Sequence, residues 1–236
     1  MKLSVVIPCY NEADNLSLLV PRCRSLAQET GAEVILVDNG STDRTPDVLL
    51  RMLANDGQVR SVRVDVNQGY GHGILAGLAA AKGDVLSWTH ADMQTDPMDL
   101  ANGLQLFREA KDFETLFVKG KRYGRPMSDT VFTIGMSVFE TLLLRTPLWD
   151  INAQPTMFSR SFYESWQEPP HDFSLDLYAY YQAKRAGLSV MRFPVRFGER
   201  AFGVSHWNID WNSKRKFIQR TVSYSRQLKR QMSQAS

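Results

Sequence analysis

Short apolar runs alternate with segments of helical periodicity over the first half of the chain. The apolar runs are rich in Val, Leu and Ile and are too short for helices, so they predict β-strands. The segments between them, near 12–28, 46–55, 70–82 and 97–110, repeat apolar residues at a helical spacing. Alternating strands and helices with short connections are typical of βαβ units, which form a parallel sheet with right-handed crossovers. The five predicted strands are Leu3–Ile7, Glu33–Val37, Val59–Val64, Val85–Trp88 and Leu116–Val118.

The second half of the chain has a less regular pattern. It contains no Pro/Gly/Ser-rich linker and no internal repeat, which favours a single domain. We therefore expect an α/β domain at 1–210, with a Rossmann-like, mostly parallel sheet flanked by helices, and a C-terminal helical elaboration at 211–236. The expected elements are an apolar helix at 129–144, an extended piece near 153–158, helices near 160–166 and 173–186, a strand at 189–193 and a basic helix from about 211.

Composition is that of a soluble globular protein, with 43% hydrophobic and 22% charged residues in a chain of 236. Cys9 and Cys23 lack the spacing of a metal site, so we expect buried thiols in a reducing, cytoplasmic compartment. The apolar N-terminus is interrupted from Pro8 and Asn11 onward, too early for a signal peptide. The longest apolar stretch, Val131–Leu144, is shorter than a membrane-spanning segment of about 18 residues, so we expect a buried or interfacial helix there.

Polar side chains follow the predicted strands, at the edge where ligands bind in open α/β sheets. Asp38, at the end of the second strand, suits a hydrogen bond to a ribose or a base edge. Asp92 and Gln94 follow the fourth strand and offer the oxygen ligands that Mg²⁺ or Mn²⁺ prefers when it is shared with substrate phosphates. Arg122 and Arg125 follow the fifth strand and could offset phosphate charge with planar, multidentate donors.

Several of these acids also have a purely structural interpretation. Asp43 before Pro46 is typical of a helix start, and Asp96 before a proline is typical of a helix cap. Asp38 alone would more often be a turn residue at a strand end. Asp92 is not explained in this way, because Asp96 already supplies the cap.

The glycine run Gly69–Gly73, with Gly77 beyond it, imitates a dinucleotide-binding fingerprint. It follows the third strand rather than the first and its glycine spacing is off by one, so a tight turn and close helix–sheet packing explain it better. His72 within the run is more typical of a surface residue in a first helical turn than of a ligand. A nicotinamide-dependent oxidoreductase is therefore a distant alternative, which a cofactor-binding assay would test.

Five motifs in order along the chain carry a resemblance to a known family. They are Ser4–Glu12 (SVVIPCYNE), Val37–Asp43 (VDNGSTD), Asn67–Gly71 (NQGYG), Ala91–Gln94 (ADMQ) and Glu199–Ser205 (ERAFGVS). Together they resemble family 2 glycosyltransferases, and within that family the dolichyl-phosphate mannose synthase-like branch, whose acceptors are polyprenyl phosphates. Each motif is weak alone, but five in the right order over residues 3 to 210 make a specific signal.

The resemblance implies a GT-A fold and an inverting, metal-dependent transfer of a sugar from a nucleotide-sugar donor, with Mg²⁺ or Mn²⁺ as cofactor. The donor base, the sugar and the acceptor do not follow from the residues. The resemblance assigns Pro8, Tyr10, Glu12 and Asp38 to the nucleoside, Asp92 and Gln94 to the metal, and Arg122, Arg200 and Ser205 to phosphates.

Three departures from the branch pattern affect the site. His90 stands where the branch has the first carboxylate of Asp-Ala-Asp, which leaves Asp92 as the main metal ligand. His90 would either ligate a softer ion such as Mn²⁺ or hydrogen-bond the sugar diphosphate. His206 replaces a lysine, which weakens a phosphate contact at neutral pH. The run Asp150–Thr156 (DINAQPT) replaces a Gly-Phe pair that precedes an Arg-rich turn.

The acceptor class decides whether a general base is needed. A phosphate monoester, with a second pKa of about 6, is mostly dianionic at neutral pH and needs no strong base. A sugar hydroxyl, as in glycan synthesis, needs a carboxylate to remove its proton. Asp176 is the candidate for this base, although an acid in the first turn of a helix is an equally good interpretation.

The C-terminal segment is basic, with seven Lys or Arg residues and no acid from Trp211 to the end. Phe217, Thr221, Tyr224 and Leu228 share one helical face, and the cations lie largely on the other. Such a helix suits an anionic membrane surface, and we expect peripheral attachment at the inner face of a membrane. The alternative is that the helix packs on the domain and its cations are solvated. Nucleic-acid binding is disfavoured by the acidic ligand edge.

Overall fold

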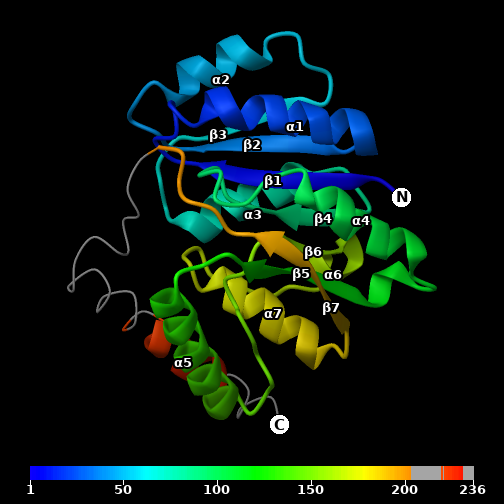
Figure 1. Ribbon diagram of the computed structural model, residues 1–236, viewed down its shortest axis with the longest axis vertical. Coiled ribbons are helices and arrows are strands. Elements are labelled where there is room, and N and C mark those ends of the chain that lie inside the picture. The colour runs from blue at the N-terminus through cyan, green and yellow to red at the C-terminus, as the bar shows by residue number, and fades with distance from the viewer. Residues whose placement is uncertain (203–218, 220, 231–236) are drawn as a thin grey trace.

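The computed structural model describes residues 1–202, 219 and 221–230 (Figure 1). Its centre is a seven-stranded sheet in the order β3-β2-β1-β4-β6-β5-β7. All neighbouring strands are parallel except β6, which runs antiparallel to both β4 and β5. The strands are β1 (Leu3–Cys9), β2 (Glu33–Asn39), β3 (Val59–Val64), β4 (Val85–Trp88), β5 (Leu116–Tyr123), β6 (Thr156–Ser159) and β7 (Ser189–Arg196).

Helices follow the strands much as the sequence pattern predicts, and a mostly parallel α/β sheet is confirmed. The helix boundaries differ from the expected ones by a few residues, because helix ends depend on local capping. The helices are α1 (Leu16–Thr30), α2 (Thr45–Leu53), α3 (Tyr70–Ala80), α4 (Asp99–Glu109), the 3₁₀ helix η1 (Phe113–Thr115), α5 (Met127–Leu144), α6 (Arg160–Glu164) and α7 (Leu175–Arg185).

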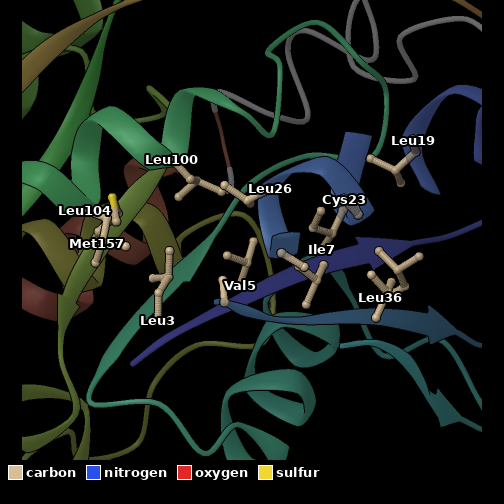
Figure 2. Packing of buried hydrophobic residues seen from close by; sticks show 14 of the residues in the cluster. Leu3, Val5, Ile7, Leu19, Cys23, Leu26, Leu36, Leu100, Leu104 and Met157 are labelled. Atoms are coloured by element: carbon tan, nitrogen blue, oxygen red, sulfur yellow. The ribbon is translucent and has the colours of Figure 1, made fainter. Parts of the chain in front are cut away.

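Two hydrophobic layers cover the sheet because successive strand residues point to opposite faces. Val5 and Ile7 of β1 belong to the layer that includes α1 and α4, and Figure 2 shows them among its buried side chains, which include Leu26, Cys23 and Leu100. Val6 faces the other layer, formed mainly by α3, α6 and α7. Gly77 of α3 lies so close to the sheet that a Cβ atom there would come within 2.3 Å of Val6 Cγ1. Close packing therefore accounts for this glycine without a dinucleotide.

The direction of β6 brings a loop from the second half of the chain to the ligand edge. Thr156, the first residue of β6, pairs with Trp88 at the carboxyl end of β4 and with Lys119 of β5. The residues just before Thr156 therefore lie where the parallel strands end. β5 is also longer than expected, so that Arg122 lies within the strand rather than after it.

α5 is the one helix, among the residues that the structure describes, that is long and apolar enough to cross a membrane by length and composition alone. This differs from the sequence-based expectation, because the helix includes polar residues but keeps a mean hydropathy of 1.3 over its 18 residues. Only 17% of that window is buried. Most of its apolar side chains therefore face outward.

Residues 221–230 form a helical segment that packs on the domain. Leu228 is buried, and Tyr224 packs against the same layer as α7. The Ser225 hydroxyl donates a 2.8 Å hydrogen bond to Glu140 Oε1 of α5. Within 221–230 the expected apolar face thus contacts protein, which supports the packing alternative for that part. Phe217, and most of the expected helix before residue 221, lie outside the described residues.

Candidate active site

Asp38 holds the turn after β2 and also faces the ligand edge. Its side chain is buried, and Oδ1 accepts a 3.0 Å hydrogen bond from the backbone N–H of Ser41. Its other oxygen, Oδ2, lies 3.3 Å from Arg63 Nη1 but accepts no hydrogen bond from the part of the chain that the structure describes. The turn interpretation and the ligand interpretation of Asp38 are therefore compatible, because each uses a different oxygen.

The loop after β1 is tied to the loop after β2. Asn11 adopts a left-handed backbone with φ of 57°, and its Oδ1 accepts a 2.9 Å hydrogen bond from the N–H of Thr42. The N–H of Glu12 donates to Thr45 Oγ1 at 2.8 Å. Tyr10 at the head of this loop is exposed, and its neighbour Cys9 pairs with Asp38 across the strands. The aromatic ring is therefore open to solvent beside the nucleoside residues expected from the sequence, of which Pro8 is half-buried.

Glu12, Asp92 and Arg200, which are far apart in sequence, form one charged cluster. Asp92 is buried, and its Oδ2 forms a 2.9 Å ion pair with Arg200 Nη2. Burial, followed by the negative charge of Asp92, raises the pKa of Glu12, whereas the positive charge of Arg200 opposes this shift. The cluster holds two acids and one cation, so it favours additional positive charge.

The residues around Asp92 fit a divalent cation that shares its ligands with a substrate. No group of three His, Cys, Asp or Glu side chains suited to a metal occurs among the residues that the structure describes. Asp92 Oδ1 accepts a 3.1 Å hydrogen bond from the backbone N–H of Gln94, so the two predicted ligands belong to one tight turn, while the side-chain amide of Gln94 donates to the carbonyl of Gly198 at 3.3 Å. Mg²⁺ and Mn²⁺ sites commonly use one or two carboxylates, and substrate phosphates and waters supply the other ligands.

His90 belongs to a stack of aromatic rings that includes Tyr70 and Phe173. Its ring stacks on Tyr70 with ring centroids 5.5 Å apart, and Tyr70 stacks on Phe173 at 4.5 Å. The charge of His90 also acts on Asp176. The position of His90 thus connects the end of β4 with the start of α7.

Arg122 and Arg125 share a carboxylate that the sequence analysis did not identify as a site residue. Arg122 forms a two-pronged pair with Asp150, with 3.2 Å between Nε and Oδ2, and Arg125 Nη1 lies 3.8 Å from Asp150 Oδ1. Both guanidinium groups lie over the ring of Phe197, 5.3 and 5.4 Å from its centroid. Asp150 begins the run 150–156, which departs from the pattern of the branch, and this departure is the feature of the sequence that could have identified it.

The positive charges of three arginines act on the single negative charge of Asp150. Burial alone would raise the pKa of Asp150, but the hydrogen bond and charge of Arg122, with the charges of Arg125 and Arg192, lower the pKa below its usual value. Asp150 is therefore ionised at neutral pH, and three cations around one anion leave a net positive charge. Arg125 Nε is buried and, among the described residues, has no hydrogen-bond partner. We call this region the basic cluster; it consists of Arg122, Arg125, Asp150 and Arg192.

Asp176 lies below the edge in a buried polar network. Its Oδ1 accepts hydrogen bonds from Gln154 Nε2 at 2.7 Å and Trp88 Nε1 at 3.3 Å. Burial raises the pKa of Asp176, and burial lowers the pKa of nearby Lys119 to about 7. Lys119 Nζ donates to Thr156 Oγ1 at 2.7 Å. Asp176 is thus in the first turn of α7, as predicted, but only 2% of its surface is exposed to a substrate.

The structure brings together most of the predicted site residues. The acidic cluster, as we call Glu12, Asp92 and their partner Arg200, lies with Asp38 at the ends of β1, β2, β4 and β7, and the basic cluster lies at the end of β5, within β7 and in the loop before β6. Ser205 and His206 lie outside the described residues. Sequence reasoning missed Gln154, Lys119 and Tyr70, because their roles depend on contacts between distant segments.

Comparison with known proteins gives the family. The model of "Glycosyl transferase family 2" matches residues 4–165. The glycosyltransferase AglD of Haloferax volcanii is 28% identical over 207 residues, which are 83% of this chain and 33% of that protein. Undecaprenyl-phosphate 4-deoxy-4-formamido-L-arabinose transferase of Pectobacterium carotovorum is 39% identical over 102 residues, 42% of this chain and 31% of that protein. The chain thus spans about a third of the length of these curated relatives.

Solved structures share the fold. A mannosyltransferase of Pyrobaculum calidifontis, in complex with GDP-Man and Mn²⁺, has a TM-score of 0.64 and 23% identity, covering 85% of this chain and 57% of that one. Glucosyl-3-phosphoglycerate synthase of Mycobacterium tuberculosis, with Mn²⁺ and UDP-Glc, has a TM-score of 0.69 and 19% identity, covering 95% and 78%. The sheet, the edge with its two charged clusters and the family match lead to one conclusion: this chain has the GT-A fold and belongs to glycosyltransferase family 2.

Proposed function

We propose that this protein transfers a sugar, with inversion, from a nucleoside-diphosphate sugar to the phosphate of a polyprenyl phosphate. The observation that carries the proposal is the division of the site into an acidic cluster, suited to a metal-bound diphosphate, and a basic cluster, suited to a second phosphate. The name of the Pectobacterium relative states that undecaprenyl phosphate is its substrate. That name agrees with a phosphate acceptor at the basic cluster.

The donor would bind across the ends of β1, β2 and β4. Asp38 Oδ2 would accept a hydrogen bond from the nucleoside, and Pro8, Tyr10 and Glu12 would line the same side. Asp92 and Gln94, with His90 as a further candidate, would hold Mg²⁺ or Mn²⁺, which stabilises the leaving diphosphate when bound. Arg200 would add positive charge on the same leaving group.

The acceptor phosphate would lie at the basic cluster. Arg122 and Arg125 keep it oriented, and its dianionic oxygen attacks the anomeric carbon as the bond from that carbon to the diphosphate oxygen breaks. No proton has to be removed from such an acceptor at neutral pH. The burial of Asp176, and the two hydrogen bonds to its Oδ1, support this route over transfer to a sugar hydroxyl.

A polyprenyl acceptor requires contact with a membrane surface, and we place that contact on α5. Figure 1 shows α5 at the end of the molecule opposite α2, beside the C-terminal segment. Arg226 and Arg230 on that segment are exposed. Cations beside an apolar surface favour an anionic leaflet, at about 1 kcal/mol for each cation near the surface. The outer face of α5, as we call it, consists of the exposed residues Met127, Val131, Ile134, Val138 and Leu142.

Mass spectrometry of reaction products tests the proposed function. The protein is incubated with UDP- and GDP-sugars, Mn²⁺ or Mg²⁺, and a short-chain polyprenyl phosphate, and the matching polyprenol and a free sugar serve as hydroxyl acceptors. We expect a glycosyl phosphate ester only with the phosphate acceptor. Asp92→Ala is the negative control, because the loss of one transition-state contact lowers the rate by about 10²–10³. Product formed only with a hydroxyl acceptor would contradict the proposal.

A further inference from the structure

Arg200 forms an ion pair with Asp92, the main predicted metal ligand, and so provides the positive charge that a metal ion would otherwise provide. Its Nη2 lies 2.9 Å from Asp92 Oδ2, and the Asp92 side chain is only 6% exposed. The Arg200 side chain is 26% exposed, so the guanidinium group covers the carboxylate from the solvent side. A divalent cation that approaches Asp92 Oδ2 therefore meets a positive group already bound there.

The backbone near Arg200 is fixed independently of this ion pair. The N–H of Gly198 donates a 2.7 Å hydrogen bond to the carbonyl of Gln94, and Gln94 Nε2 donates to the carbonyl of Gly198 at 3.3 Å. The N–H of Phe197 donates to the carbonyl of Tyr123 at 2.9 Å. Residues 197 and 198 are thus held by bonds that do not depend on the ion pair, and they anchor the chain two residues before Arg200.

The guanidinium group also has unused hydrogen-bonding capacity. Arg200 Nε is buried and has no hydrogen-bond partner among residues 1–202, 219 and 221–230. The negative charge of Asp92 raises the pKa of nearby Glu12 and the positive charge of Arg200 lowers it, so Arg200 is the cation between two acids. An arriving metal ion would add a second cation to the cluster and displace Arg200 from Asp92. A diphosphate bound to the same metal would be the nearest anion for the released guanidinium.

We propose that Arg200 and the divalent cation are alternative partners of Asp92, so that cation binding transfers Arg200 from Asp92 to the diphosphate of the donor. The inference rests on the proposed function, because it takes a nucleoside diphosphate and a divalent metal as the ligands. It adds a consequence that neither ligand gives alone. The metal and the donor each have a low affinity while the ion pair between Asp92 and Arg200 is intact. Binding of either one breaks this ion pair and so raises the affinity for the other.

A double-mutant cycle on nucleotide binding without metal tests the ion pair directly. UDP and GDP are titrated by calorimetry in EDTA into the wild type, Asp92→Asn, Arg200→Ala and the double variant. Asp92→Asn keeps an Oδ1 acceptor for Gln94 but releases Arg200, so it should tighten binding by about fivefold to tenfold, the range for a partly buried, hydrogen-bonded ion pair. In the Arg200→Ala background, the same substitution should change affinity by less than about twofold.

An equal gain in both backgrounds would overturn the inference, because it would reflect only the loss of a negative charge. A second arm follows Mn²⁺ without nucleotide by electron paramagnetic resonance. Arg200→Ala should tighten Mn²⁺ binding by about fivefold or more, whereas Arg196→Ala, which removes an exposed arginine from the end of β7, should not. Unchanged Mn²⁺ affinity in Arg200→Ala also overturns the inference. If neither UDP nor GDP binds with or without Mn²⁺, the proposed donor fails and the inference fails with it.

Discussion

Single acids of the site use one oxygen for the fold and keep the other at the ligand edge. Asp38 uses Oδ1 to hold the N–H of Ser41, and Asp92 uses Oδ1 to hold the N–H of Gln94. Their Oδ2 atoms face arginines instead. An alanine substitution removes both functions at once, whereas an asparagine keeps the structural hydrogen bond. Paired variants at each position therefore separate stability from binding.

Asp38 gives the first prediction at this scale. Asp38→Asn should keep the turn and the melting temperature, yet weaken nucleoside-diphosphate binding by about 1–3 kcal/mol, because a charged acceptor at a buried edge is lost. Asp38→Ala should weaken binding by at least as much and also lower the melting temperature. Calorimetry and thermal melting measure the two effects. Unchanged nucleotide affinity in both variants would contradict the assignment of Asp38 to the donor.

Asp176 distinguishes between the two acceptor classes. Asp176→Asn can still accept hydrogen bonds from Trp88 and Gln154, so the fold should persist. Transfer to a polyprenyl phosphate should change by less than about tenfold, whereas loss of a general base costs about 10² or more. The measurement is kcat with the phosphate acceptor in the variant, with circular dichroism as the folding control. A folded variant with a hundredfold loss would favour the sugar-hydroxyl alternative.

The donor half of the site could be predicted from the sequence, but the acceptor half could only be predicted in part. Asp38 and Asp92 follow buried strands, so the rule that ligands bind at strand ends locates them directly. Asp150 follows no strand and lies 28 residues from its partner Arg122. Its role depends on the path of α5 and the reversal of β6, which no local pattern encodes.

Among the elements, α5 and the helical segment 221–230 form a unit that differs from the rest of the domain. α5 buries only Ser137, Glu140 and Leu144, and one of these is an acid. Glu140 Oε1 accepts the hydrogen bond from Ser225, and Oε2 is buried with no hydrogen-bond partner in the described ranges of the chain. The contact between these two helical segments therefore contains a carboxyl group whose charge is costly to bury.

Glu140 makes this contact sensitive to pH. Burial raises the pKa of Glu140 from 4.5 to about 7 in the folded protein. Between these values the folded state binds more protons than the unfolded state, so the free energy of unfolding falls as pH rises from about 4.5 to 7 and is then constant. The fall attributable to Glu140 is at most about 3.5 kcal/mol, at roughly 1.4 kcal/mol per pKa unit.

Glu140→Gln should remove this part of the pH dependence, because the amide cannot ionise. Denaturant unfolding at pH 5 and pH 8 measures it, and the variant should gain stability over the wild type as pH rises. A constant difference between the two proteins at both pH values would show that the carboxyl group is already charged, or already neutral, across the range.

The outer face of α5 gives a prediction about membranes. Val131 and Leu142 are 62% and 74% exposed, and burial of such a side chain in lipid contributes about 1.5–3 kcal/mol. Val131→Glu and Leu142→Glu should each reduce binding to anionic vesicles by roughly tenfold or more. Leu50→Glu on α2 is the matched control, since Leu50 is 73% exposed at the opposite end of the molecule. Equal co-sedimentation of all three variants with the wild type would place the membrane contact elsewhere.

On the scale of the whole molecule, the alternation of strands and helices predicts the parallel half of the sheet. β1 to β4 and their helices follow the order of βαβ units, and their hydrophobic runs identify them one by one. The order β4-β6-β5-β7 does not follow from any run. β6 has only four residues, so its sequence pattern does not indicate whether the strand runs parallel or antiparallel to its neighbours. Its place is set by packing against β4 and β5, which is a long-range property.

The antiparallel direction of β6 separates the donor side of the site from the loop at residues 146–155, which belongs to the acceptor side. The loop can therefore be exchanged without a change in any donor-side residue. Residues 146–155 reach the edge only because β6 enters the sheet there, and they carry Asp150 and Gln154 but no residue of the donor side. Exchange of this loop for that of a relative with another acceptor should change the KM for the acceptor and leave the Kd for the nucleotide within about twofold, because Asp38 and Asp92 are held by Ser41, Gln94 and arginines that lie outside this loop. A chimaera that loses nucleotide affinity would show that the two parts are coupled. Steady-state kinetics and calorimetry on such a chimaera would therefore show whether acceptor choice is a replaceable module in this protein.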